Sequence, residues 1–359
     1  MASEIKHRES NIELFRIIMM LLIVAHHYVV NSGVLDVISE PPYTWRHYFL
    51  CIFGMWGQIG INCFVLITGY FMCKSDITMR KFLKLLLEVL FYNVVVYVIF
   101  TLFGYESFSM AGMLKVVNPI KSIAKDFIGC FLIYYLMIPF LNAMVNHLTK
   151  KQHAILISLC MLFFVVWDHL PDVEYRFNYV EWFCVLHVIA SYIRFYIPTK
   201  EERMNNMREV LLVFAGGGVF AISSVICQNL MIEQGWHVGW QYKWVSDCNA
   251  IVGVISSVMM FIGFKGLRIK YNPLVNSIAA STFGVLMIHA NSDTMRRWLW
   301  QDVCQNVDWV NSPYMPLHAI GTVLAIFAIC IAMDKARIYL FEKPTFKIVD
   351  RVFAKYGIK

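Results

Sequence analysis

Residues 12–31 read IELFRIIMMLLIVAHHYVVN, which is long enough to cross a bilayer as a helix and yet contains Glu13, Arg16 and two histidines. The runs of this kind are continuous and do not alternate with a period of two, which favours helices over a β-barrel. The sequence therefore predicts an all-α, polytopic membrane protein with about ten transmembrane helices. The predicted spans are 12–31, 49–72, 82–104, 126–147, 153–170, 180–197, 210–231, 248–266, 277–294 and 316–333.

The composition supports this class and excludes others. The chain has 359 residues, of which 59% are hydrophobic and 15% charged. Soluble domains carry about 45–50% apolar and about 25% charged residues, so a soluble globular protein, a disordered chain and a secreted disulfide scaffold are excluded. The net charge of +7 indicates cytoplasmic loops beside anionic lipid and no nucleic-acid partner.

The distribution of Lys and Arg predicts the orientation. With the N-terminus inside, the inner segments hold 21 of these residues and the outer segments eight, among them Arg296 and Arg297. Positive charge concentrates on the cytoplasmic side, so both termini are predicted to be cytoplasmic. The first run lacks a cleavage site and is interpreted as a retained span. We expect an integral, multi-pass protein of the plasma (inner) membrane, with one transmembrane domain (1–333) and a basic cytoplasmic tail (334–359).

Cysteine and glycine patterns give no metal or nucleotide site. The ten cysteines include no C-x-x-C pair and lie mostly in apolar runs, which indicates packing. Cys248 and Cys304 are the one pair that could form a disulfide near the outer face. The three glycines at 216–218 lie inside a span without a following Lys-Ser or Lys-Thr, which favours close helix packing over phosphate binding.

The first span carries the strongest chemical signal. Arg16 and His27 are eleven residues apart, which returns within about 20° of one helix face at about 16 Å along the axis. Glu13 lies one turn before Arg16 and is placed for an ion pair. Buried ionisable groups are costly and usually face a cavity or a partner. The alternative is that Glu13 and Arg16 snorkel at the interface and the histidines bond neighbouring helices.

His26 and His27 point about 100° apart on a helix, so we expect only one of them to face a site, and the spacing favours His27. The pattern Arg16-x10-His27 with Glu13 before it resembles the signature of the acyltransferase-3 family of membrane acyltransferases. Three further segments resemble that family in the right order, namely GQIGINCFVLITGYFM (57–72), ASTFGVLMIHAN (280–291) with His289, and Glu342-Lys343-Pro344.

The resemblance implies an enzyme. Members of the family take an acyl group, usually acetyl, from coenzyme A and pass it to a hydroxyl of a surface carbohydrate or its lipid-linked precursor. Acetyl-CoA or a related acyl-CoA is then the donor, with no permanently bound cofactor. His27 would act as the general base because histidine titrates near neutrality. Arg16 would orient the donor or stabilise the oxyanion, and Glu13 would support Arg16. His289 would assist His27 or shape the cavity, and a structural role explains it equally.

Further residues are candidates for binding the donor. Arg80, Lys81 and Lys84 lie at the predicted inner mouth and suit coenzyme A phosphates. Lys81 and Lys84 stand where the family has Arg-x-x-Arg, and Thr68 stands where it has serine. The alternative is ordinary positive-inside topology. We expect Glu88, one turn after Lys84, to pair with it.

Glu181 and Asp247 lie near the predicted outer rim and could bind acceptor hydroxyls. Trp240, in the loop GWHVGWQYKWVSD, could stack on a sugar, although an interfacial aromatic belt is the commoner explanation. The same buried charges also suit a transporter or flippase of a small or lipid-linked substrate. A binding or sensor module that keeps only the scaffold is a third possibility. The sequence does not determine the oligomeric state.

Overall fold

The computed structural model describes residues 9–119, 127–170, 178–197 and 207–357, and within these ranges all regular structure is helical. This confirms the predicted all-α class. The helices are α1 (Ser10–Val30), α2 (Val34–Ser39), α3 (Trp45–Gly54), α4 (Gly57–Met72), α5 (Met79–Leu102), α6 (Met110–Val117), α7 (Phe127–His147), α8 (Lys150–Cys160), α9 (Tyr179–Tyr196), α10 (Met207–Glu233), α11 (Ile251–Gly266), α12 (Pro273–Ala279), α13 (Thr282–His289), α14 (Asp293–Arg297), α15 (Asn306–Trp309), α16 (Met315–Arg337) and α17 (Lys343–Tyr356).

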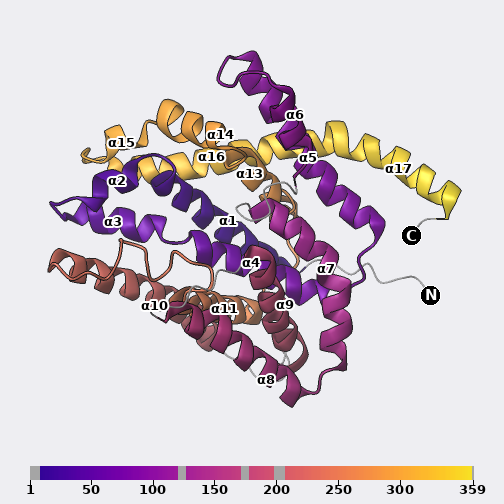
Figure 1. Cartoon of the computed structure of the whole chain (residues 1–359), viewed down its shortest axis with the longest axis horizontal. Helices are drawn as coiled ribbons and strands as arrows, with labels where there is room; N and C mark the ends of the chain where they lie inside the picture. Colours follow the sequence, from indigo (N-terminus) through magenta and orange to yellow (C-terminus); the bar gives the residue numbers. More distant parts are fainter. Residues whose placement is uncertain (1–8, 120–126, 171–177, 198–206, 358–359) are drawn as a thin grey trace.

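Helix α1 lies in the middle of the bundle. It contacts α3, α4 and α11, and also α12, α13 and α16 (Figure 1). Ile12, Phe15, Met19 and Ile23 recur every three or four residues and are buried, as expected for a helix with one face in the core. The span with the most unusual sequence is therefore enclosed by protein on several sides.

Six helical stretches are long and apolar enough to cross a membrane, and a bent pair, Pro273–His289 with Asp293–Trp309, adds a seventh if it counts as one span. Within the described residues, α8, α9 and α11 do not meet the same requirements of length and hydropathy. The chain is thus an integral, multi-pass membrane protein, with six to seven candidate spans rather than the predicted ten. The six are Ser10–Val30, Trp45–Met72, Met79–Leu102, Phe127–His147, Arg208–Glu233 and Met315–Tyr356.

Two predicted spans are interrupted. In 153–170, α8 ends at Cys160 and the chain continues as a π-helix (Met161–Val166) and a short 3-10 helix (Trp167–His169). In 277–294, the chain bends by 94° between α13 and α14. The Ser292 hydroxyl accepts a hydrogen bond from Met295 N at 3.1 Å and so caps α14, which starts a new helix in a new direction.

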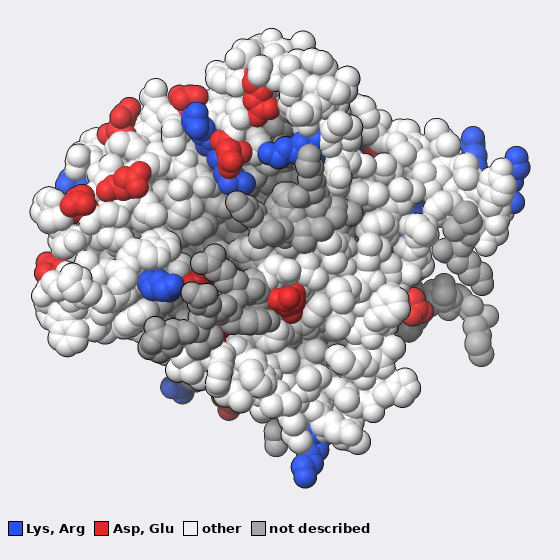
Figure 2. All heavy atoms as spheres, viewed as in Figure 1, with Lys and Arg blue, Asp and Glu red and all other residues white. Residues whose placement is uncertain are grey.

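Apolar surface and close packing agree with a membrane environment. On the face shown in Figure 2, charged atoms are sparse over broad areas, with acidic and basic atoms side by side over α6 and α14. Large apolar side chains such as Leu102, Phe140 and Leu317 are exposed, as lipid contact requires.

Gly217, one of the three glycines predicted to allow close helix packing, does so. An added Cβ at Gly217 would lie 2.9 Å from Ser256 O, which confirms close packing of α10 on α11. Cys248 and Cys304 are free thiols.

The predicted tail does not begin at a structural boundary. Helix α16 continues to Arg337, a π-helical turn (Ile338–Glu342) follows, and α17 completes the C-terminal stretch. Asp334 and Arg337 are buried in the bundle, and Phe346 is the buried residue of α17. Only the part beyond this turn has the amphipathic character expected of a surface helix.

Candidate active site

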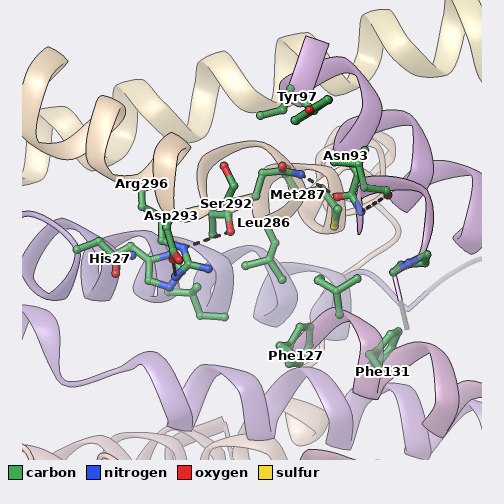
Figure 3. A pocket seen from close by; sticks show the side chains of 18 of the residues that line it. His27, Asn93, Tyr97, Phe127, Phe131, Leu286, Met287, Ser292, Asp293 and Arg296 are labelled. Carbon is green, nitrogen blue, oxygen red and sulfur yellow. Dashed lines mark hydrogen bonds and ion pairs between the residues drawn. The ribbon is translucent and has the colours of Figure 1, made fainter. Parts of the chain in front are cut away.

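A cavity of about 1000 Å³ lies beside the last three turns of α1, from Met20 onward. Its walls come from α1, α4, α5, α6, α7, α13 and α14. One part is apolar, with Phe64, Phe131, Phe283 and Leu286 among its lining residues. The other part is polar and carries His27, neutral amides and a few charged groups, and Figure 3 shows His27 and Arg296 at one end with Phe127 and Phe131 at the other. The cavity therefore combines an apolar wall with a hydrogen-bonding end.

His27 is held by a second histidine. Its Nδ1 lies 2.9 Å from His289 Nε2, and His289 Nδ1 lies 2.6 Å from the carbonyl oxygen of Val285. A carbonyl oxygen only accepts, so His289 donates from Nδ1 and, when neutral, accepts at Nε2. His27 must then donate from Nδ1, which leaves the lone pair on Nε2. The chain of hydrogen bonds fixes the tautomer that a general base needs.

His26 also lines the cavity, so the prediction that only one of the two histidines faces a site is wrong. The cavity extends around the helix far enough to reach both rings, whose centroids are 5.5 Å apart. His26 Nδ1 donates to Gly54 O at 2.5 Å. An added Cβ at Gly57 would lie 2.5 Å from the His26 ring, so this ring fits only because position 57 is glycine. His27 differs from His26 in having a second imidazole as its partner.

Glu13 and Arg16 form the predicted ion pair, with Arg16 Nη1 3.5 Å from Glu13 Oε2. Glu13 is buried and Arg16 is partly exposed. Neither is among the residues lining the cavity, which follows α1 only from Met20 to Asn31. The structure thus confirms the pair, but the shared helix face does not bring Arg16 into the cavity with His27, because the two are separated by about 16 Å along the axis.

The predicted donor-binding residues lie outside this cavity and already have partners. Arg80 makes two hydrogen bonds to Asp350, at 2.7 and 3.1 Å, and Lys84 pairs with Glu342 at 2.6 Å. Lys81 donates to the carbonyl oxygen of Asp76 at 2.8 Å, and the Thr68 hydroxyl donates to Phe64 O at 2.9 Å. The acidic residues of the C-terminal stretch therefore neutralise part of this basic group.

The expected pair between Glu88 and Lys84 is wrong. Glu88 pairs with Arg337 at 3.1 Å, and Lys84 pairs with Glu342 instead. The two residues have suitable helical spacing, but a buried guanidinium on α16 supplies the partner of Glu88. Local spacing cannot reveal a partner that lies so far away in the sequence.

The three predicted acceptor residues also lie outside the cavity. Glu181 belongs to the capping box of α9, where its Oε2 accepts from Asn178 N at 3.2 Å. Asp247 pairs with Lys243 at 3.2 Å. Trp240 is exposed and its ring contacts Tyr242 at a centroid distance of 5.4 Å.

Several polar groups of the cavity had no role assigned from the sequence. Asn291 donates to Asn93 Oδ1 at 3.1 Å, and Gln58 donates to the Tyr179 hydroxyl at 3.1 Å. Arg296 lines the cavity beside His27 (Figure 3). Asn291 stands two residues after His289 and could have been found from the segment 280–291 that resembles the family. Arg296 is a single arginine in a connecting segment, and no sequence pattern marks it as a site residue.

The fold and the cavity define a polytopic membrane protein with a histidine pair at a buried, partly polar site. The chain matches the acyltransferase domain of the acyltransferase-3 type over residues 9–335. This match covers most of the chain, so the protein belongs to this family of membrane O-acyltransferases. No curated protein and no solved structure matches the chain.

Proposed function

We propose that this protein transfers an acyl group, most simply acetyl, from cytoplasmic acyl-CoA to a hydroxyl of a cell-surface carbohydrate or its lipid-linked precursor. The family establishes a membrane acyltransferase, which works in a lipid bilayer and uses an acyl donor. The observation that carries the proposal is His27 on the wall of a cavity of about 1000 Å³, with the buried His289 bonded to its Nδ1.

The chemistry follows from the tautomer of His27. The acceptor hydroxyl attacks the thioester carbonyl carbon and gives its proton to His27 Nε2, while His27 Nδ1 stays bonded to His289. The new C–O bond leaves an oxyanion on the former carbonyl oxygen. When this intermediate collapses, the C–S bond breaks and the thiolate of coenzyme A takes the proton from the imidazolium. His27 returns to its starting state.

The lining of the cavity suits a hydroxylated acceptor. Asn31, Gln58, Asn93 and Asn291 contribute amides, which both donate and accept hydrogen bonds. Neutral amides recognise neutral hydroxyls, as in a sugar. Glu181, Asp247 and Trp240 remain candidates for contacts with an acceptor at the outer rim.

The donor is proposed to approach from the side of Arg80, Lys81 and Lys84, with Thr68 further along the path. Arg16 would then orient the part of the donor that stays about 16 Å from the thioester. Its phosphates must displace the contacts of Arg80 with Asp350 and of Lys84 with Glu342. The exposed pair of Arg80 and Asp350 is weak enough to exchange partners.

The same proposal places both termini in the cytoplasm and the protein in the plasma membrane. The charge bias of 21 to eight Lys and Arg residues supports this orientation. A ten-span topology counts four crossings beyond the six long candidates. These are the stretch from α8 to the 3-10 helix, α9, α11 and the bent pair.

The test measures transfer of labelled acetyl from acetyl-CoA to the glycan fraction of membrane vesicles that contain the protein. We expect His27→Ala to reduce the rate about 10²–10⁴-fold, because the acceptor loses its base. His147→Ala is the matched control, since His147 is exposed at the end of α7 and bonds only Ala143 O of its own helix. Full activity of His27→Ala would refute the role of His27. Movement of a lipid-linked glycan without acetyl-CoA would favour a flippase.

A further inference from the structure

Arg296 is brought to the cavity by the bend between α13 and α14. Helix α13 ends at His289, and the chain turns by 94° before α14 begins at Asp293. Arg296 lies in the last turn of this short helix and lines the same cavity as His27. Figure 3 shows Arg296 and Asp293 beside His27. The segment that holds the partner of His27 therefore also supplies a cation next to it.

Among the residues that the structure describes, the guanidinium of Arg296 has partners that anchor it but do not use all of its donors. Its Nη1 donates to Asp293 Oδ1 at 3.1 Å, and its Nε donates to Ala290 O at 3.4 Å. Both contacts come from the same short segment, and neither uses Nη2. A guanidinium carries donors on each of its nitrogens. Arg296 is therefore oriented on one side and can donate from Nη2 to a group in the cavity.

Within the proposed function, we infer that Arg296 is a catalytic residue that donates from Nη2 to the oxyanion of the acyl-transfer intermediate. The negative charge forms on the former carbonyl oxygen when the acceptor attacks and His27 takes the proton. A fixed positive charge beside that oxygen stabilises the intermediate more than the neutral thioester. Arginine stays charged throughout, so it does not compete with His27 for the proton. Arg16, which was the sequence-based candidate for this role, does not line the cavity.

The neighbouring Arg297 provides a matched control. It is exposed, it carries the same charge, and it is not among the residues that line the cavity. Arg296→Gln and Arg297→Gln therefore change the charge of this segment equally, and a difference between them reports on the cavity alone. Thermal unfolding of both variants checks that the fold is intact.

The experiment measures thiol release from acetyl-CoA by membrane vesicles as a function of acetyl-CoA concentration. We expect Arg296→Gln to lower kcat about 10²–10³-fold, as for loss of one oxyanion donor, with KM for acetyl-CoA changed less than about threefold. Arg297→Gln should match the wild type. Millimolar methylguanidinium should restore part of the activity of Arg296→Ala and none of that of His27→Ala.

The outcomes separate this inference from the proposed function. An Arg296→Gln variant with wild-type kcat beside an inactive His27→Ala variant would overturn the role of Arg296 alone. A raised KM with unchanged kcat would also overturn it, because Arg296 would then bind substrate without stabilising the intermediate. Absence of any acyl transfer by the wild-type protein would overturn both.

Discussion

This helical bundle contains two groups of ionisable side chains, which differ in whether fixed ion pairs occupy their charged atoms. The cavity group consists of His27 and Arg296, which line the cavity, and of His289, which is buried and bonded to His27. The second group, which we name the ion cluster, joins α5 to α16 and the π-helical turn after it. It consists of Arg337, Glu88, Asp334, Glu342 and Lys84.

The two arginines show the difference most clearly. Arg337 is 6% exposed and pairs Nη2 with Glu88 at 3.1 Å, Nε with Asp334 at 2.8 Å and Nη1 with Glu342 at 2.9 Å. Arg296 is 38% exposed and pairs with Asp293 alone among acidic residues in the described part of the chain. A guanidinium whose three nitrogens all pair with fixed carboxylates holds helices together. A guanidinium with a nitrogen that does not pair with these carboxylates, beside a cavity, can donate a hydrogen bond to a ligand.

The largest effect, on the free energy of unfolding, is expected from a substitution that breaks the ion cluster. Arg337→Met would leave Glu88 and Asp334 buried without their shared cation, while Glu342 would keep Lys84 as a partner. Removing one partner of a buried ion pair costs about 3–5 kcal/mol, because the remaining charge is uncompensated. Thermal unfolding of the purified protein should show a large fall in the midpoint or a loss of folded protein.

Arg351→Met is the matched control for this variant, because Arg351 is an exposed arginine on α17. Combining Arg337→Met with Glu88→Gln should recover part of the lost stability, since one buried charge is removed. An Arg337→Met protein that unfolds at the midpoint of Arg351→Met would show that the cluster is not structural.

A smaller effect is expected from His289, the buried residue that orients His27. His289→Ala leaves His27 in place but removes the acceptor of its Nδ1 proton. The ring can then rotate or change tautomer, and misplacement of a reacting group by about 1 Å costs about 10²-fold in rate. Acetyl transfer should fall by this factor while the unfolding midpoint changes little.

His318→Ala is the control for His289→Ala. His318 Nδ1 lies 2.9 Å from the hydroxyl of Tyr28, the residue after His27, yet His318 is not among the residues lining the cavity. Equal rates for the two variants would show that the hydrogen bond from His27 to His289 does not matter for catalysis.

The contrast also explains what the sequence could predict. The helical class and the ion pair of Glu13 with Arg16 follow from apolar length and from spacing along one helix, whereas His289 is proposed from the resemblance of residues 280–291 to the family pattern. Two partners of Arg337, Glu88 and Glu342, do not follow from such spacing, because they lie on α5 and on the turn after α16 and meet Arg337 only in the folded bundle. Arg296 was counted as an outer-loop charge, since nothing in a linear pattern indicates that a 94° bend returns it to the cavity.

The smallest effect is expected from the exposed pair of Arg80 and Asp350, which belongs to neither group. Both side chains are about half exposed, although Arg80 makes two hydrogen bonds and lies 4.9 Å from the centroid of the Phe346 ring. Water and salt screen such a pair, so Asp350→Asn should leave the unfolding midpoint unchanged.

The same variant tests whether Arg80 binds the donor. If Arg80 meets donor phosphates, its release from Asp350 should lower KM for acetyl-CoA by about twofold at low salt, an effect that added salt should remove. Asp302→Asn, at another exposed acidic residue, should leave KM unchanged. A KM that rises in Asp350→Asn would mean that Asp350 positions Arg80 for the donor and does not compete with it, and the C-terminal helix would then belong to the donor site.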